Sequence, residues 1–267
     1  MGGRRRGRPR PGERRARGPV ALPPPGVGPG FGSCHRAPAL GAWSPPADRG
    51  HGGDAMLVAH WTFDVATVEG RRVHVASGAA PDAELDEVAE IVPGRAGEAL
   101  ALGAHARAVI PAAPQLVFSQ IFGFTVAFSV NVTEEPTGEW RSLLYKPVGE
   151  NDARGLGLWL YPDAMRLRLQ LFTAKGPDYM DTHARLTVGE WTHIAFVVNA
   201  QGMVLYVDGV QDVAEGLDEP VVPPAGPILL GSEQTKPGFG GLIDDLRVYA
   251  SALDAEAVRI LADRGPS

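Results

Sequence analysis

From Met56 onward the sequence is dominated by short apolar runs that alternate every second residue, separated by Gly, Pro, Asn and Asp. In one such run, three leucines alternate with Arg166, Arg168 and Gln170. A period of two with one apolar face is the pattern of a half-buried β-strand. The even spacing of these runs predicts an all-β fold, an antiparallel sandwich rather than alternating βαβ units.

Turn residues agree with this prediction. Asn199 and Gly202 separate two apolar runs, and Asp208-Gly209 is a strong hairpin signal because both residues accept positive φ. One helix is expected after Tyr249, with Asp254 as its N-cap. The expected strands are Leu57–Phe63, Gly123–Val132, Arg141–Lys146, Gly155–Tyr161, Met165–Phe172, Trp191–Asn199, Met203–Val207, Ile228–Gly231 and Leu242–Tyr249.

The first 55 residues differ in composition from the rest. They carry ten Arg against three acidic residues, a balance of +7, which leaves −13 for the remainder of a chain with net charge −6. Gly and Pro dominate and apolar periodicity is absent, so this stretch cannot bury enough apolar surface to fold. We therefore predict a disordered tail over residues 1–55 and one domain over residues 56–267.

Three interpretations of the tail remain open. A basic arm can hold nucleic acid, but interleaved aromatic residues for base stacking are missing, so nucleic acid is not an expected partner. A flexible tether is the second interpretation. The third, which we favour, is that Met56 is the natural start and the preceding residues do not belong to the native protein.

Other sequence features limit the cellular context. The lone Cys34 excludes an intramolecular disulfide framework and a cysteine-based zinc site. No apolar run reaches the roughly 18 residues of a membrane-spanning helix, and the Arg-rich start is not followed by the apolar stretch of a signal peptide. These features favour a cytoplasmic location.

Four segments resemble a known family. Gly189–Val197 followed by Leu205–Gly209 is similar to the W-x-H-x-A … Y-x-D-G hairpin of laminin-G-like domains. Gly238–Tyr249 resembles their closing F-x-G-x-I-D-D-x-R-x-Y strand. His60–Asp64 resembles the opening strand, and Pro93–Leu100 the turn into the second strand. Together they resemble the laminin-G-like branch of the concanavalin A-like lectin/glucanase superfamily.

The resemblance implies a two-sheet antiparallel jelly roll with a short C-terminal helix. It also implies a non-catalytic module that binds glycans or protein partners, often with a structural calcium. We therefore expect a carbohydrate-binding module rather than an enzyme. The alternatives are a protein–protein interaction or structural module, and a degenerate glycoside hydrolase of the family 16 type.

A calcium site is expected at Asp64 and Asp244. The resemblance places Asp244 at the closing-strand aspartate whose counterparts bind calcium near the amino-terminal strand. If Asp244 faces the same side as Leu246 and Val248, its carboxylate needs a cation or a hydrogen-bonding partner. The alternative is that Asp244 accepts backbone N–H groups at a strand end and binds no metal.

The expected ligand-binding face lies on two neighbouring strands. If the leucines of residues 155–161 face the core, Trp159 and Tyr161 face outward, and Arg166, Arg168 and Gln170 share that face, with Tyr145 and Lys146 at its edge. A guanidinium beside an aromatic ring suits a hydroxyl-rich or carboxylate-bearing sugar. The alternatives are that cation–π pairs merely cover the sheet, or that Trp159 points inward.

A catalytic interpretation rests on residues 84–90. Glu84, Asp86 and Glu90 fit the E-x-D-x-x-x-E spacing that places nucleophile and acid/base carboxylates on one strand in family 16 glucanases. The segment falls where the family has a variable loop, however, so no catalytic residue is expected. We interpret Trp191 and His193 as structural.

Overall fold

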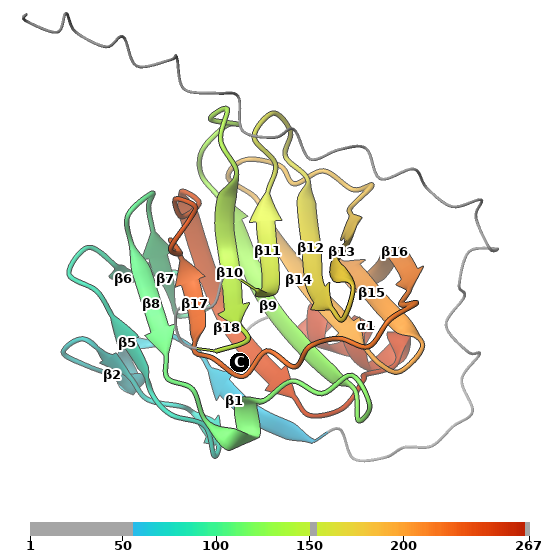
Figure 1. Ribbon diagram of the computed structural model, residues 1–267. Helices are drawn as coiled ribbons and strands as arrows, with labels where there is room; N and C mark the ends of the chain where they lie inside the picture. The colour runs from blue at the N-terminus through green and yellow to red at the C-terminus, as the bar shows by residue number, and fades with distance from the viewer. Residues whose placement is uncertain (1–55, 150–153, 265–267) are drawn as a thin grey trace, which may run out of the picture. The chain divides into compact units, whose positions relative to one another are not determined.

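The computed structural model describes residues 56–149 and 154–264, which form two stacked antiparallel sheets (Figure 1). The predicted tail over residues 1–55 lies outside the described residues. The first sheet contains β16 (Val210–Gly216), β15 (Gly202–Val207), β14 (Trp191–Val198), β9 (Phe124–Val132), β18 (Gly241–Tyr249), β1 (Leu57–Trp61) and β4 (Ser77–Gly78) in that order, with β7 (Glu98–Leu102) paired to β18 and β6 (Glu90–Pro93) paired to β7.

The second sheet lies in front of the first in Figure 1. Its order is β13 (Gly176–Asp181), β12 (Leu167–Thr173), β11 (Gly155–Leu160), β10 (Arg141–Pro147), β17 (Ile228–Gly231), β8 (Arg107–Ile110), β5 (Ala83–Leu85), β3 (Arg72–Val73) and β2 (Val68–Glu69). Two 3-10 turns, η1 (Val65–Thr67) and η2 (Pro114–Leu116), and the helix α1 (Ala255–Arg264) complete the described elements. The predicted all-β sandwich with a short C-terminal helix is confirmed.

Every strand expected from the sequence is present. The strands that the sequence does not reveal are those without a long apolar alternation. The strands β2, β3 and β4 have two residues each, and β13 reads GPDYMD with only Met180 buried. Such segments become strands because their neighbours offer a free edge for pairing, which is a tertiary effect.

The predicted hairpins have the expected turn chemistry. Asp208 and Gly209 both have positive φ, 49° and 75°, between β15 and β16. The Asn199 side chain accepts hydrogen bonds from the backbone of Gln201 and Gly202 between β14 and β15. These turns fix the strand register.

The apolar core fills the space between the two sheets. The leucines at alternate positions of β11 and β12 are fully buried there. The helix α1 covers the outer face of the first sheet, where Val258 and Leu261 pack with Ala195 and Tyr206. Its N-terminus is capped by Asp254 Oδ1, which accepts the Ala257 N–H at 2.7 Å as predicted. The second sheet has no such helix on it, within the part of the chain that the structure describes.

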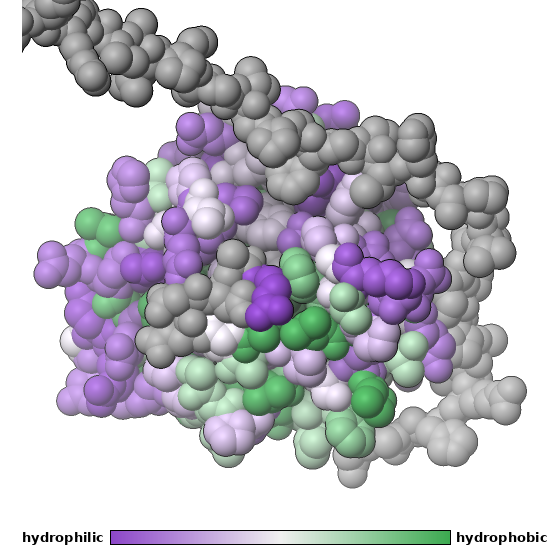
Figure 2. All heavy atoms as spheres, in the orientation of Figure 1, coloured by the Kyte–Doolittle hydropathy of each residue, from purple (hydrophilic) through white to green (hydrophobic). Residues whose placement is uncertain are grey.

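The segment between β8 and β9 exposes apolar side chains. Ile121 and Phe122 are each 81% exposed, and Val117 is 43% exposed. Figure 2 shows apolar residues gathered along the lower edge of the molecule in this view. Of the helices described, none has the length and apolar character needed to cross a membrane.

Candidate functional site

The outer face of β11, β12 and β13 holds all five residues of the predicted ligand-binding set. Trp159 on β11 lies opposite Arg168 on β12. Tyr161 follows β11, and its backbone N–H donates to the carbonyl oxygen of Arg166 at 3.0 Å. Gln170 lies two residues beyond Arg168, on the same face of β12. The structure therefore brings this set together, and its role in binding stays a prediction.

Arg168 is held by a carboxylate. Its Nε donates to Asp181 Oδ1 at 2.7 Å, and its Nη2 donates to Asp181 Oδ2 at 2.9 Å. Nη2 also donates to the Tyr161 hydroxyl at 2.7 Å, and that hydroxyl donates to Asp181 Oδ2 at 2.6 Å. A bidentate guanidinium–carboxylate pair has a fixed geometry. Arg168 therefore holds the side chains of Asp181 and Tyr161 in place, and few of its own N–H donors remain for a ligand.

The pKa values on this face follow from the same contacts. Burial pushes the pKa of Asp181 upward, but the hydrogen bonds from Arg168 and Tyr161 and the charge of Arg168 outweigh it, so this pKa lies below its usual value. Burial and the hydrogen bond to Asp181 raise the pKa of Tyr161. Asp181 is thus ionised and Tyr161 neutral at physiological pH.

Three aromatic rings surround the Arg168 guanidinium. Its Cζ lies 4.0 Å from the ring centroid of Tyr179, 5.1 Å from that of Trp140 and 5.2 Å from that of Tyr161. The rings of Trp140 and Tyr161 are themselves in contact, with centroids 4.4 Å apart. Tyr179 remains 44% exposed. Its ring, supported on one side by Arg168, is a rigid apolar surface on which a sugar ring can pack.

Trp159 faces outward but is only 5% exposed. Lys236 Nζ lies 4.4 Å from its ring centroid, and Tyr145 stacks at 6.4 Å. A Cβ added to Gly157 would lie 2.1 Å from the Trp159 ring, so the indole lies flat over this glycine. Trp159 thus lies on the outer face, as the first interpretation has it, but Lys236 covers its ring.

Replacing Gly157 with alanine should lift the Trp159 indole off the sheet. The new Cβ meets ring carbons that cannot move without a new side-chain rotamer, so we expect a loss of stability of about 1–3 kcal/mol. The tryptophan emission should shift to longer wavelength. Gly103→Ala is the matched control, since a Cβ there meets nothing within 4 Å. Unchanged emission in Gly157→Ala would contradict the packing described.

Lys146 does not flank this face. It pairs with the inward-facing Leu156 and is fully buried between the sheets. Its Nζ donates to the carbonyl oxygen of Gly226 and lies 5.1 Å from the ring centroid of Phe118. The sequence-based placement was wrong for Lys146 because a register shift between Ser142 and Leu144 changes which residues of β10 face the core.

Several residues of the face were not expected from the sequence: Trp140, Tyr179, Asp181 and Lys236. Trp140 lies in a loop, Lys236 lies in another loop far along the chain, and β13 lacks an apolar alternation. The available signal was the pair of aromatic and acidic residues at positions 179 and 181, two residues apart. That spacing would have placed them on one face of a strand, had a strand been recognised.

Asp64 and Asp244 both approach the turn before β7. Asp244 Oδ2 accepts the Arg95 N–H at 3.1 Å, and Asp64 Oδ1 accepts the Glu98 N–H at 3.2 Å. They meet because β18 is paired with β1 along one part of its edge and with β7 along another. A Cβ added to Gly97 would lie 2.2 Å from Asp64 Oδ1, so this position suits glycine.

The sequence suggested that Asp244 shares a face with Leu246 and Val248. In the structure it does not. A bulge at Asp245, with φ of 59°, shifts the pairing of β18 with β9. Asp244 consequently pairs with Ser129, away from the core between the sheets, whereas Leu246 and Val248 belong to that core. A bulge turns the following side chains to the opposite face.

The Asp244 carboxylate is buried and incompletely paired. It is fully buried, and its Oδ1 has no hydrogen-bond partner among the described residues. Burial raises its pKa to about 7, the charges of Asp245 and Asp64 add to the rise, and backbone hydrogen bonds from Arg95 and Ala96 oppose it. A cation beside Oδ1 would relieve this cost.

The ligands for such a cation are few. Among the residues that the structure describes, no group of three or more His, Cys, Asp or Glu side chains comes together at a metal-binding distance. Calcium takes six to eight oxygen ligands, including backbone carbonyls and water. Two carboxylates are compatible with calcium only if backbone oxygens and water complete the shell.

His193 has the environment of a structural residue. It is 3% exposed, and burial together with the charge of Arg95 lowers its pKa to about 4. Its backbone N–H donates to Asp208 Oδ1 at 2.8 Å, which ties β14 to the following hairpin. This bond comes from the backbone and does not depend on the imidazole, whose Nδ1 has no hydrogen-bond partner among the described residues.

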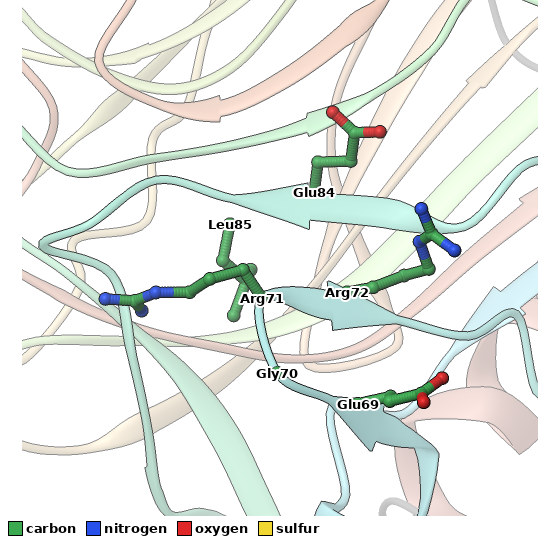
Figure 3. Close-up of a pocket in the computed structure, with 6 residues that line it drawn as sticks. All are labelled: Glu69, Gly70, Arg71, Arg72, Glu84 and Leu85. Atoms are coloured by element: carbon green, nitrogen blue, oxygen red, sulfur yellow. The ribbon is translucent and has the colours of Figure 1, made fainter.

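A polar hollow of about 490 Å³ lies at the far edge of the second sheet, beside β2, β3 and β5. Figure 3 shows that the charged ends of Glu84, Arg71 and Arg72 point in different directions, so they do not converge on one point. Asp86 accepts the N–H groups of residues 88 and 89, and Glu90 belongs to β6 in the other sheet. Glu84, Asp86 and Glu90 therefore do not line one strand, as the two-carboxylate mechanism requires.

Comparison with known proteins agrees with the architecture. A family model described as the concanavalin A-like lectin/glucanases superfamily matches residues 102–259. Among curated proteins, none matches the sequence. Solved structures with the same fold include the binding domain of Paraclostridial Mosquitocidal Protein 1, with a TM-score of 0.65 and 19% identity over 78% of this chain and 52% of the other.

Two further structures illustrate the range of similar folds. Domain 4 of AbnA, a GH43 extracellular arabinanase from Geobacillus stearothermophilus solved with arabinotriose, has a TM-score of 0.62 and 24% identity over 78% of this chain and 98% of the other. The receptor binding domain of botulinum neurotoxin D has a TM-score of 0.63 and 13% identity over 78% of this chain and 52% of the other. The chain thus spans about half the length of the toxin domains that it matches.

Proposed function

Because the chain belongs to the concanavalin A-like lectin/glucanase superfamily, we propose that it is a non-enzymatic module that binds carbohydrate on the outer face of β11, β12 and β13. The observation that carries the proposal is the set of three aromatic rings held around one guanidinium, with Tyr179 open to solvent. A rigid aromatic surface beside hydrogen-bonding side chains is how proteins hold a sugar ring.

The similar structures support this proposal. Two of them are the binding domains of toxins, and the third is an arabinanase domain solved with arabinotriose. The same fold hosts many functions, so the proposal depends on the face itself and not on the fold alone. The proposal also includes a structural calcium at Asp64 and Asp244, supported by the Oδ1 of Asp244, which has no hydrogen-bond partner among the described residues.

Glycan binding should depend on Tyr179. Its ring contributes stacking area and little to the core, so Tyr179→Ala should weaken binding to any glycan selected on an array by at least about tenfold, or 1.4 kcal/mol, without unfolding the protein. Affinity is measured by calorimetry, and folding by the melting temperature. Phe122→Ala is the matched control, because Phe122 is an exposed aromatic residue on another surface.

The surface that carries the control residue also supports a second candidate function. The exposed Val117, Ile121 and Phe122 favour a protein–protein interaction module, since contiguous apolar surface is typical of docking sites. If Tyr179→Ala still binds the glycan and Phe122→Ala does not, glycan binding takes place on the surface around Phe122 instead. Binding of no glycan by the wild-type protein would reject the carbohydrate proposal.

A further inference from the structure

We propose that the outer face of β11, β12 and β13 selects saccharides that carry an oxyanion, a carboxylate or a sulfate, and that Arg166 contacts that group. This inference rests on the proposed carbohydrate-binding function and specifies its substrate class. Arg166 is then a specificity-determining residue, whereas the aromatic rings bind the sugar skeleton. The inference follows from which charges on this face are already paired.

The other two cations of the face have partners. Arg168 forms its bidentate pair with Asp181, with Nε–Oδ1 at 2.7 Å. Lys236 lies 3.3 Å from Glu233 Oε1 and covers the Trp159 ring. Each of these pairs is locally neutral, so neither cation has net charge to offer an incoming anion.

Arg166 has no such carboxylate partner in the part of the chain that the structure describes. Among the described residues, no Asp or Glu oxygen lies within ion-pair distance of its guanidinium, and no side-chain hydrogen bond joins it to the protein. The charge of Arg166 helps to lower the pKa of Asp181, but the hydrogen bonds of that carboxylate come from Arg168 and Tyr161. Of the three cations described on this face, Arg166 is therefore the one without an ion-pair partner among the described residues.

The Arg166 guanidinium is also oriented. Its Cζ lies 4.8 Å from the ring centroid of Tyr161. Tyr161 is itself fixed by its hydrogen bonds to Arg168 and Asp181. A guanidinium stacked by its flat face keeps its N–H edge free, and that edge matches the two oxygens of a carboxylate or sulfate. Arg166 is half-buried, so solvent screens such a contact less than it would a fully exposed pair.

The negative charge of the whole domain means that selection of an anionic sugar depends on short-range contacts at this face. The residues after the first 55 carry a net charge of −13, which repels long polyanions at a distance. An acidic sugar must therefore be held by short-range contacts, with the anion at Arg166 and the ring on the adjacent Tyr161 and Tyr179. A general attraction to anions, as in nucleic-acid-binding proteins, is not expected.

The test uses pairs of glycans that differ only in charge. The probes are trigalacturonic acid and its methyl ester, and 3′-sulfolactose and lactose, measured by calorimetry against the full chain. We expect at least tenfold tighter binding of one charged probe than of its neutral partner. Arg166→Gln should reduce this preference to less than about threefold, or 0.65 kcal/mol, and leave the affinity for the neutral partner within twofold. The carboxylate and sulfate arms show which oxyanion is preferred.

Matched variants keep the result interpretable. Arg166→Lys should retain part of the preference, and Arg259→Gln should leave it unchanged because Arg259 lies on α1, which packs on the other sheet. Tyr179→Ala should weaken both members of a pair. Equal binding of charged and neutral probes, or a preference that survives Arg166→Gln, overturns the inference while the proposed function stands. Binding of neither member of either pair, with no binder on a glycan array, rejects both.

Discussion

Lys146→Met is expected to stabilise the protein by roughly 2–4 kcal/mol at pH 6, or about 4–16 °C in melting temperature for a domain of this size. Lys146 is fully buried, and burial lowers its pKa to about 7 from 10.5. Holding the charged amine inside therefore costs on the order of 5 kcal/mol below pH 7. Methionine fills a similar volume without a charge, and the gain is reduced because the Gly226 carbonyl loses its donor.

The pH dependence gives the sign of the effect. The folded-state pKa of Lys146 lies below that of the unfolded chain, so between about pH 7 and 10.5 unfolding takes up a proton. The contribution of Lys146 to stability is present above the unfolded-state pKa and is lost as the pH falls through the folded-state value. The advantage of Lys146→Met should consequently shrink by about 2–3 kcal/mol between pH 6 and pH 9.

Chemical denaturation at both pH values measures this change. Lys236→Met is the matched control, because Lys236 also lies over an aromatic ring but has a carboxylate partner and a side chain that is 27% exposed. The control should show no gain at pH 6. A destabilised Lys146→Met at pH 6, or a gain that does not depend on pH, would show that the lysine is not buried in the way described.

Asp244→Asn should have an effect that reverses sign with calcium. In a chelator, the variant is expected to be more stable than the wild-type protein at pH 8 by on the order of 3 kcal/mol, because the asparagine removes a buried, ionised carboxylate. Burial raises the folded-state pKa of Asp244 to about 7 from 3.8. The contribution of a carboxyl with a raised pKa is present below the unfolded-state value and is lost as the pH rises through 7. The advantage of the variant should therefore fall by about 2–3 kcal/mol between pH 8 and pH 5.

Calcium should raise the stability of the wild-type protein but not that of Asp244→Asn. At a calcium concentration one thousand times the dissociation constant, binding stabilises the folded wild-type protein by about 4.1 kcal/mol, which exceeds the advantage of the variant in chelator, and the variant lacks the carboxylate needed for this gain. Melting temperatures in calcium and in chelator measure the effect. Glu84→Gln is the control, since Glu84 is an exposed residue on β5 in the other sheet and should leave the calcium response unchanged. Absence of any calcium-dependent shift in the wild-type protein would reject the metal site.

Local sequence patterns determine most of the architecture. The alternation of leucines with Arg166, Arg168 and Gln170 determines which side of β12 faces the core, because successive side chains of a strand point to opposite faces. Asp208-Gly209 determines a hairpin, because few other residues accept positive φ at both positions. The predicted ligand-binding set is together for the same reason, since its members lie at the outer positions of two paired strands or in the turn that joins them.

Tertiary structure alone decides the pairing state of the charged and aromatic side chains. Asp181 reaches Arg168 from β13, and Lys236 covers Trp159 from a distant loop, and neither contact has a local sequence signal. The bulge at Asp245 moves Asp244 to the outer side of its strand, and a register shift turns Lys146 inward. The physical reason is that periodicity assigns a side chain to a face, whereas its partners, burial and charge depend on which distant segments pack against that face.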